Sequence, residues 1–404
     1  MPSIPDPRSL TSNEFAHAAA GLVRGTADDG RPLGGQAGAL DVYRRYFRDG
    51  PSSIPELSHL APTLLREVRE DSPEGEVIKF LTRVRGVQNQ PGGEPTGHGR
   101  TIPLPPPATL AQLQDLSAES VLIPMVSSKG AATYTLCVSS QVGCAMGCTF
   151  CETGQMGLLR SLTPQEIVNQ WIAATHAVKV RPKNIVFMGM GEPMDNFENV
   201  VQAISVLKDH NGPCVPVGQI TVSTVGHVDG IRKLADKARE HGWHRLGLAL
   251  SLNAPNDADR SAIMPINRKW PLAEVQKAIL DWPRYAGNKV CVEYVLIPGV
   301  NDSRAHAEQI AEFMRPFGLC ESGRIGGQDL FGVLNLIPYN PRRNSPWPAP
   351  TEEQVAQFLN WLLDFKVFAK RRRTKGRTLM GACGQLGSEH IRKRRVVGVA
   401  QAAE

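Results

Sequence analysis

Short apolar runs and longer amphipathic runs alternate along the chain between residues 134 and 337. The apolar runs predict strands at Tyr134–Val138, Asn184–Met188, Gln219–Ser223, Leu246–Ser251, Val290–Leu296 and Val333–Ile337. Apolar residues at helical spacing predict helices at Thr163–His176, Phe197–Asp209, Val228–His241, Leu272–Trp282 and Ala305–Phe317. This alternation predicts an α/β fold with a parallel sheet, either open and doubly wound or closed into a full or partial barrel.

Polar, glycine-containing or cysteine-containing segments directly follow the predicted strands. They are Cys137–Cys151, Gly189–Pro193, Ser223–Thr224, Ser251–Asn253 and Tyr339–Pro341. Ser and Asn commonly cap helices or close turns, so each of these segments is unremarkable when taken singly. Because α/β folds bind ligands at the carboxyl ends of their strands, the segments together predict one pocket. Glu192 could accept a hydrogen bond there from a ligand ammonium group.

The amino-terminal third has a different character. Residues 1–37 are rich in Gly, Pro, Asp and Ala with weak periodicity, and we expect part of this segment to be disordered. Helical patterns, including Ala39–Phe47 and Thr63–Val68, then predict a small helical accessory domain over residues 38–101. The Pro-rich segment at 102–117 is typical of a stiff linker.

Composition describes a globular protein with a mild basic bias. Of 404 residues, 41% are hydrophobic, and 45 Lys and Arg against 39 Asp and Glu give a net charge of +6, which permits a nucleic-acid partner without requiring one. No apolar run is long enough to span a bilayer and the start has no secretory pattern, so we expect a cytoplasmic protein without membrane association. In that reducing compartment, the eight cysteines are expected to be ligands, catalysts or core residues.

Four of these cysteines fall between Cys137 and Cys151. Cys144, Cys148 and Cys151 follow a C-x3-C-x2-C spacing, which lets three thiolates converge on one cuboidal [4Fe–4S] cluster and leaves one iron without a protein ligand. The competing interpretation is structural zinc. Such sites normally take four ligands in two paired motifs, and no second C-x2-C or H-x3-H pair lies nearby.

The carboxyl end is strongly basic. Its basic residues are Lys366, Lys370, Arg371, Arg372, Arg373, Lys375, Arg377 and Arg392 to Arg395. This density predicts contact with nucleic acid, the alternative being a solvated basic tail. Between the two runs, Cys383 is flanked by Gly and Ala, which is typical of an open loop with a reactive thiol.

These features resemble the RlmN/Cfr family of radical-SAM RNA adenosine methyltransferases from about Ala118 to Leu386. The resemblance rests on motifs that occur in the family's order: Cys-Val-Ser-Ser-Gln-Val-Gly-Cys at 137–144, Gly-Met-Gly-Glu-Pro at 189–193, Ala-Pro-Asn-Asp at 254–257, Pro-Ile-Asn at 265–267, Gly-Val-Asn-Asp at 299–302, Asn-Leu-Ile-Pro-Tyr-Asn-Pro at 335–341 and Ala-Cys-Gly-Gln-Leu at 382–386. The resemblance implies a partial (β/α)6 radical-SAM barrel over 118–365, an amino-terminal accessory domain that contacts RNA, and a basic tail over 366–404.

The resemblance also implies the cofactors and the catalytic residues. The [4Fe–4S] cluster on Cys144, Cys148 and Cys151 would chelate S-adenosyl-L-methionine (SAM) and cleave it to a 5′-deoxyadenosyl radical, with two SAM molecules used per turnover. Cys383 would be methylated and carry the methylene radical to adenine, Cys137 would release the product through a transient disulfide, and Glu119 would be the general base. The positions that match SAM-binding residues are Gly191, Glu192, Ser223, Ser251, Leu252, Asn253 and Asn340.

The implied activity is methylation of an adenine ring carbon, C2 rather than C8, in rRNA, tRNA or both. A reductant such as flavodoxin or ferredoxin would supply electrons, and we expect a monomer. Departures from the family pattern bear on the RNA target: Asn253 replaces the usual His, Glu152 follows the last cluster cysteine, Arg377–Met380 lacks an acidic residue, and Gly318–Gly332 resembles an insertion.

Two alternatives stay open at this point. One is a radical-SAM enzyme with a divergent RNA or non-RNA substrate, and the other is a non-catalytic iron–sulfur protein that binds RNA. Cys137 and Cys383 favour the enzyme, because a binding protein needs neither a methyl carrier nor a resolving thiol.

Overall fold

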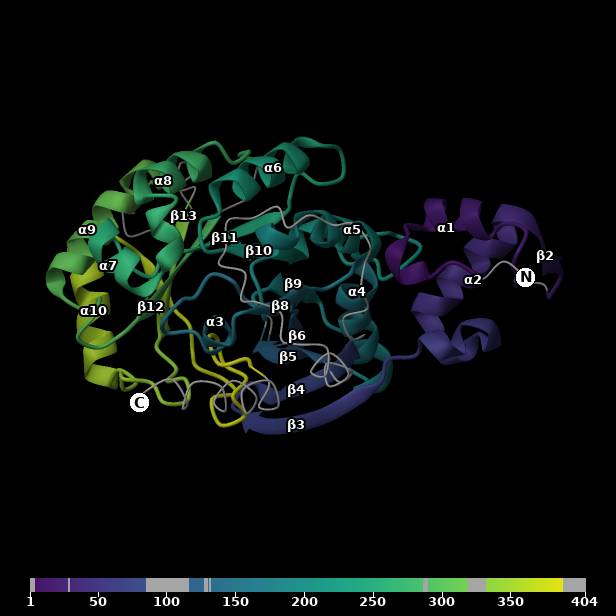
Figure 1. Ribbon diagram of the computed structural model, residues 1–404, viewed down its shortest axis with the longest axis horizontal. Coiled ribbons are helices and arrows are strands. Elements are labelled where there is room, and N and C mark those ends of the chain that lie inside the picture. The colour runs from purple at the N-terminus through teal and green to yellow at the C-terminus, as the bar shows by residue number, and fades with distance from the viewer. Residues whose placement is uncertain are drawn as a thin grey trace, which may run out of the picture. The chain divides into compact units, whose positions relative to one another are not determined.

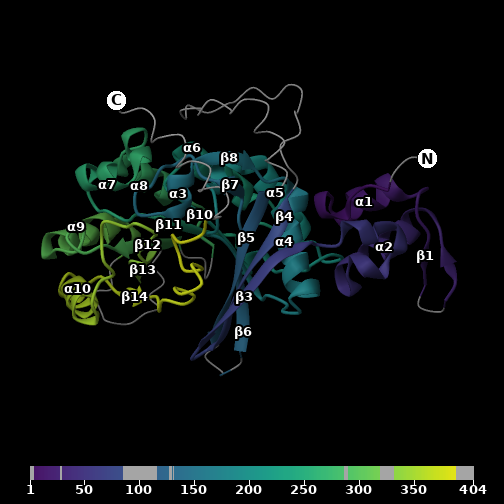
Figure 2. The ribbon, with the colours of Figure 1, turned by 60° about the horizontal axis from the view of Figure 1, so that its bottom comes forward.

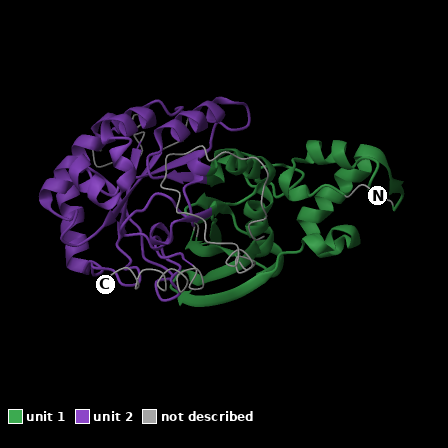
Figure 3. Ribbon diagram, in the orientation of Figure 1, with its two compact units in different colours: residues 1–142, 160–189, 196–220 green, residues 143–159, 190–195, 221–404 purple. Residues whose placement is uncertain are grey.

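The computed structural model describes residues 4–27, 30–84, 116–126, 130, 132–285, 290–318 and 332–387. It divides into two compact units (Figure 3): unit 1 holds residues 1–142, 160–189 and 196–220, and unit 2 holds residues 143–159, 190–195 and 221–404. Most of the predicted linker at 102–117, most of Gly318–Gly332 and the whole of the basic run Arg392–Arg395 lie outside the described residues. Within the described ranges, no helix has both the length and the apolar character needed to cross a membrane.

Unit 1 begins with two packed helices, α1 (Ser12–Ala19) and α2 (Gly35–Asp49). A capping box starts α1, in which the Thr11 backbone N–H donates to the Glu14 carboxylate at 2.7 Å. Phe15 buries its ring against Tyr43 of α2, with ring centroids 5.5 Å apart. Residues 12–19 of the segment at 1–37 therefore form an ordered helix, because one apolar face is enough to dock a short capped helix.

The sheet of unit 1 is mostly antiparallel. Strands β3 (Leu64–Ser72), β4 (Gly75–Val84), β5 (Leu116–Val126) and β6 (Ala132–Cys137) pair in sequence as antiparallel neighbours, and β9 (Asn184–Phe187) joins β6 in parallel. The helix predicted at Thr63–Val68 is wrong, since Leu64 onward forms β3. Its alternating Arg and Glu residues fit a helix face locally, but pairing with β4 over nearly its full length selects the strand.

Helices α4 (Pro164–Ile172) and α5 (Phe197–Leu207) confirm two predicted helices of unit 1. Gln170 of α4 ties its helix to the sheet. Its side-chain oxygen accepts hydrogen bonds from the Ser120 hydroxyl and the Ser139 backbone N–H, both at 2.8 Å. A buried amide satisfied in this way fixes the chain as it leaves β6.

The sheet of unit 2 is entirely parallel and runs in the order β10 (Ile220–Thr224), β11 (Gly247–Ser251), β12 (Val290–Leu296), β13 (Gly332–Pro338) and β14 (Ala369–Arg371), as Figure 2 shows. The strands are joined through α6 (Val228–Arg239), α7 (Asp257–Ile263), α8 (Leu272–Leu280), α9 (Arg304–Met314) and α10 (Glu352–Asp364) (Figure 1). All six predicted strands are present, and so are the five helices predicted between residues 163 and 317. The α/β class with parallel strands is confirmed. It could be predicted because strands of a parallel sheet are buried on both faces and form continuous apolar runs in the sequence.

The remaining elements are short. They are β1 (Gly25–Thr26), β2 (Pro32–Leu33), β7 (Gln141–Gly143), β8 (Leu158–Ser161), α3 (Glu152–Met156), a π-helical turn at Ala173–Ala177 and 3-10 turns at Pro7–Ser9, Pro51–Ser53, Pro55–Leu60, Pro193–Asn196, Val217–Gln219, Pro265–Arg268 and Arg315–Phe317. Of these, α3 directly follows the third cysteine of the predicted cluster motif, so it belongs to the site.

Candidate active site

The cluster loop, residues Cys144–Cys151, is a compact turn of unit 2 whose cysteines share one buried environment. Cys144 and Cys148 are 9% and 6% exposed and pack in one core cluster, against which Cys151 also packs. The Cys151 backbone N–H donates to the Cys148 carbonyl at 3.2 Å, which closes the turn. Gly147, between Cys144 and Cys148, has a φ of +66°, a backbone conformation that glycine adopts without strain.

The electrostatics of this loop suit a metal cluster. Burial raises the pKa of the Cys144 and Cys148 thiols, and the neighbouring thiols raise the pKa further. A thiolate buried in this way needs a compensating cation, and cluster iron would provide one. Within the described ranges, no three His, Cys, Asp or Glu side chains gather as ligands of a single metal ion. A cuboidal cluster takes each thiolate on a different iron, so its ligands stand further apart than those of one ion, and the assignment of these three cysteines as its ligands stays a prediction.

Glu192 lies in the loop that follows β9 and is 2% exposed. Its two carboxylate oxygens accept hydrogen bonds from the Met194 backbone N–H at 3.1 Å and the Val225 backbone N–H at 2.9 Å. Burial raises its pKa to about 7. Gly191 beside it has a φ of +101°. The carboxylate is thus fixed at the strand ends where the sequence predicts a ligand ammonium group.

The other predicted SAM-binding residues lie at the carboxyl ends of strands β10, β11 and β13. They are Ser223, Ser251, Leu252, Asn253 and Asn340. Carboxyl ends of neighbouring parallel strands meet at one edge of a sheet, so the structure gathers these positions in unit 2. The side-chain oxygen of Asn340 accepts a hydrogen bond from Arg377 Nε at 3.2 Å, which links this edge to the carboxyl-terminal segment.

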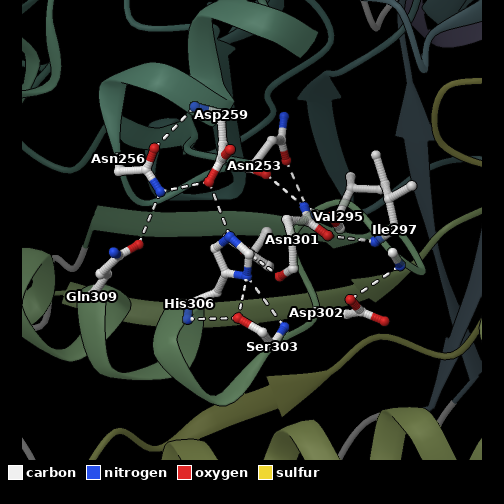
Figure 4. A network of polar contacts seen from close by, with 12 residues as sticks. Asn253, Asn256, Asp259, Val295, Ile297, Asn301, Asp302, Ser303, His306 and Gln309 are labelled. Atoms are coloured by element: carbon white, nitrogen blue, oxygen red, sulfur yellow. Dashed lines mark hydrogen bonds and ion pairs between the residues drawn. The ribbon is translucent and has the colours of Figure 1, made fainter.

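Asn253 is held by a network of buried amides (Figure 4). Its side-chain oxygen accepts from the Val295 backbone N–H at 3.0 Å, and its backbone carbonyl accepts from the Asn301 side chain at 2.7 Å. Its φ is +56°, a conformation that Asn tolerates better than most residues. Fully buried Asn301 also accepts from the Ile297 backbone N–H at 2.7 Å. Asn253 therefore fixes the backbone at the carboxyl end of β11.

The Cys383 loop, residues Gly381–Leu386, docks on α3 beside the cluster loop. The Glu152 backbone N–H donates to the Gly384 carbonyl at 2.7 Å, and the Thr153 hydroxyl donates to the Leu386 carbonyl at 2.6 Å. Burial raises the pKa of the Cys383 thiol, and the Arg372 guanidinium opposes that rise. The structure thus brings Cys383 and the predicted cluster ligands together, although they are far apart in sequence.

The Glu152 side chain adds a second anchor to this docking. It is 2% exposed, and its carboxylate accepts from the Arg343 backbone N–H at 3.0 Å. The Cys383 loop contacts the same segment, since Gln385 Nε2 donates to the Pro341 carbonyl at 3.0 Å. One carboxylate therefore holds the segment against which the Cys383 loop packs.

Replacing Glu152 with alanine is expected to loosen the Cys383 loop. Loss of a hydrogen bond to a charged acceptor costs about 1.5–3 kcal/mol, so alkylation of Cys383 in iron-free protein should accelerate about tenfold. Peptide mass mapping after timed iodoacetamide treatment measures that rate, with exposed Cys214 as the internal reference. Glu152→Gln, which keeps an acceptor oxygen, should change it less. An unchanged rate in the alanine variant would show that the side chain does not hold the loop.

Glu119 and Cys137 belong to unit 1. Glu119 on β5 is 1% exposed and forms an ion pair with Lys79 of β4 at 2.7 Å. Cys137, at the end of β6, is 7% exposed, and the hydroxyl of nearby Ser139 donates to the Glu119 carbonyl at 2.7 Å. The structure places these two residues on neighbouring strands, and their approach to Cys383 stays a prediction. The seven described cysteines all carry free thiols.

Several polar residues of the site carried no recognisable signal in the sequence. Arg372 forms an ion pair with Glu293 of β12 at 2.8 Å, although Arg372 looked like one member of a basic run. Arg260 is fully buried, although charged residues are seldom buried and its sequence neighbours Asp257, Asp259 and Ser261 are polar. Lys79 sits in a segment taken for part of a helical domain. Only the pairing of distant strands and loops gives these residues their partners.

Comparison with known proteins agrees with this geometry. The model of the radical SAM superfamily matches residues 138–314. The crystal structure of a radical SAM methyltransferase from Sphaerobacter thermophilus superposes with a TM-score of 0.72 at 32% identity, over 95% of this chain and 99% of that one. The fold and the cysteine loop thus define a radical SAM protein, which implies a [4Fe–4S] cluster and SAM.

Relatives with assigned names narrow this class. The probable dual-specificity RNA methyltransferase RlmN 1 of Protochlamydia amoebophila is 41% identical over 283 residues, which cover 70% of this chain and 73% of the relative. The dual-specificity RNA methyltransferase RlmN of Anaeromyxobacter sp. (strain Fw109-5) is 42% identical over 393 residues, covering 95% and 91%. The chain belongs to the RlmN family of radical SAM RNA methyltransferases.

Proposed function

We propose that this protein methylates a ring carbon of adenine in RNA, C2 rather than C8, through an S-methyl group on Cys383. The docking of the Cys383 loop on α3, directly after the cluster cysteines, carries this proposal. A thiol held beside the place where SAM would be cleaved can receive a methyl group and later lose a hydrogen from it. The hydrogen bonds that join this loop to Glu152 and Thr153 support Cys383 as the thiol that would meet the cofactor.

Cys144, Cys148 and Cys151 would hold the cluster, which would supply the electron that cleaves SAM reductively. The chain's part is to orient SAM. Glu192 would accept from the SAM ammonium group, while Ser223, Ser251 to Asn253 and Asn340 would line the rest of the molecule. Two SAM molecules would be used per turnover, one for the methyl group and one for the radical. A small electron carrier such as flavodoxin or ferredoxin would serve as reductant.

The indirect route has a chemical reason. Ring carbons C2 and C8 of adenine are not nucleophilic, so they cannot attack the SAM methyl group directly, whereas a carbon radical adds to them. Cys383 must therefore accept the methyl group first, and it does so as a thiolate. The Arg372 guanidinium favours that thiolate, and Glu293 holds Arg372 in place through the 2.8 Å ion pair. These contacts support Cys383 as the methyl carrier.

Glu119 would be the general base that takes the proton from the substrate carbon. Its carboxylate pairs with the Lys79 ammonium at 2.7 Å, a contact that fixes the position of the side chain on β5. Glu119 is not a surface carboxylate, since it is 1% exposed. Burial of a paired carboxylate on β5 supports a functional role.

Cys137→Ala is expected to accumulate a covalent complex between protein and RNA. In the proposed cycle the Cys137 thiolate attacks the Cys383 sulfur and forms a transient disulfide, while the bond between that sulfur and the methylene carbon on the base breaks and this carbon takes up a proton to become the methyl group. Without Cys137 the crosslink has no resolving thiol. Denaturing gels of anaerobic reactions with labelled RNA measure it, and Cys214→Ala is the control for loss of an unrelated cysteine. An active Cys137→Ala enzyme with no crosslink would remove this role.

RNA is the partner that the basic carboxyl-terminal segment suits. Arg371, Arg373 and Lys375 lie within the described part of that segment, close in sequence to the Cys383 loop. Phosphate contacts of this kind position a nucleic acid and weaken as salt rises. We propose rRNA, tRNA or both as substrate and expect a cytoplasmic monomer.

The test of this function is anaerobic incubation of cluster-loaded protein with SAM, reductant and separate rRNA and tRNA pools, followed by nucleoside analysis. Methyladenosine substituted at a ring carbon is expected, and its retention time against standards distinguishes C2 from C8. RNA that stays unmodified while SAM is still cleaved would favour a different substrate. Absence of both cleavage and modification would favour a protein that only binds RNA.

A further inference from the structure

Arg260 is a charged side chain with no exposed surface. It lies on α7 in unit 2, next to the strand ends that carry the predicted SAM-binding residues, and is 0% exposed. Its nitrogens donate to four oxygens: Nε to Leu252 O at 2.9 Å, Nη1 to Asn267 Oδ1 at 2.8 Å, and Nη2 to Val225 O at 2.5 Å and Ser251 O at 3.2 Å. One guanidinium thus holds the backbone that leaves β10 and the backbone that leaves β11.

All four acceptors are neutral. Among the described residues, Arg260 forms no ion pair. Hydrogen bonds satisfy its donors, but they do not cancel its charge, and an isolated charge is costly to bury. Burial lowers its pKa to about 10, so the guanidinium stays protonated at neutral pH. A buried cation of this kind calls for an anion that completes the site.

The anion that fits is the cluster loop with its thiolates. Thr149, next to Cys148, donates its backbone N–H to the carbonyl of Ile263 at the end of α7, at 2.9 Å. Cys148 packs in the same core cluster as Ile263. A negative charge on Cys148, and after it that of Asp257, would raise the pKa of Arg260 against the effect of burial. A backbone hydrogen bond therefore joins α7, which carries Arg260, to the cluster loop, which would carry the iron.

We propose that Arg260 is a positioning residue that also serves as the counter-charge of the cluster: its hydrogen bonds hold the SAM-facing ends of β10 and β11, and its charge raises the cluster's reduction potential. Reduction adds one electron and makes the cluster more negative, so a fixed cation nearby stabilises the reduced form more than the oxidised form. This inference rests on the proposed cluster site but not on methyl transfer to RNA.

A redox titration of the cluster tests the charge. At a fixed applied potential, the ratio of reduced to oxidised cluster, followed by electron paramagnetic resonance, is expected to fall about tenfold in Arg260→Gln, which corresponds to about 59 mV for a one-electron couple. Arg260→Lys keeps the charge and should retain the wild-type ratio. Arg239→Gln, which removes an exposed arginine of α6, is the control and should also retain it.

The hydrogen bonds are tested separately from the charge. Arg260→Lys and Asn267→Ala should each lower the thermal midpoint of iron-free protein and weaken SAM binding while leaving the potential unchanged. An unchanged ratio in Arg260→Gln, or an equal fall in Arg260→Lys, overturns the counter-charge proposal. If Arg260→Gln does not fold, Arg260→Lys decides alone: a retained ratio with weaker SAM binding supports the proposal, and a tenfold lower ratio overturns it.

Methylation of RNA in the same wild-type samples separates the two claims. A normal shift of potential in protein that modifies no RNA would leave Arg260's role standing and remove the proposed function. Methylation of RNA by the wild-type protein, together with an unchanged cluster potential in Arg260→Gln, would support the proposed function and remove the role of Arg260 as counter-charge.

Discussion

Replacement of Cys383 with alanine is expected to abolish methylation of RNA, with a fall of at least about 10⁴-fold, as when the nucleophile of a covalent mechanism is removed. The iron content should not change, because the three cluster cysteines are intact. Cleavage of SAM should also persist, since neither the cluster nor Glu192 is altered. The measurement is nucleoside analysis of RNA together with quantitation of 5′-deoxyadenosine and of iron.

A control with another cysteine makes this result specific. Cys214 is exposed and lies outside the cluster loop and the Cys383 loop, so Cys214→Ala should methylate RNA at the wild-type rate. Methylation by Cys383→Ala at more than a trace level would mean that the methyl group does not travel through this sulfur.

Replacement of Cys148 with alanine is expected to have the broadest effect. Cys148 is 6% exposed at the centre of the cluster loop, and its loss leaves two thiolates for a cluster that requires three. Iron and sulfide per chain should fall to near background after anaerobic reconstitution, and both 5′-deoxyadenosine and methyladenosine should disappear.

The two variants therefore differ in a way that separates their roles. Cys148→Ala should lose iron, SAM cleavage and methylation together, whereas Cys383→Ala should lose methylation alone. A Cys148→Ala protein that retains a full cluster would contradict the ligand assignment. Circular dichroism of both proteins checks that α/β structure survives the change.

The α/β core could be predicted because its strands are buried on both faces and carry their signal locally. Val290–Leu296 coincides with β12, and the other predicted strands differ from the observed bounds only at their ends. The ribbon of β3 and β4 could not be predicted in this way. The charged residues of β3 suit an exposed helix or an exposed strand equally, and the choice depends on pairing with a strand later in the chain.

The residues of the site also divide into those that the sequence predicts and those that it does not. The spacing of Cys144, Cys148 and Cys151 predicts a cluster loop, because such a loop is a local structure. The contact of Glu152 with Gly384 joins residues more than two hundred positions apart, and no local pattern encodes it. Arg260 was missed because its partners are mainly backbone carbonyls at the strand ends, which leave no residue type to recognise.

The central claim is that the methyl group passes through Cys383 and loses a hydrogen there before it reaches adenine. Anaerobic reaction with SAM whose methyl group carries three deuterium atoms tests this most directly. We expect the new methyl group on RNA to retain two deuterium atoms and 5′-deoxyadenosine to gain one. Before RNA is methylated, the Cys383 peptide should carry a labelled methyl group. Transfer of an intact trideuterated methyl group to RNA, with an unmodified Cys383, would contradict this claim.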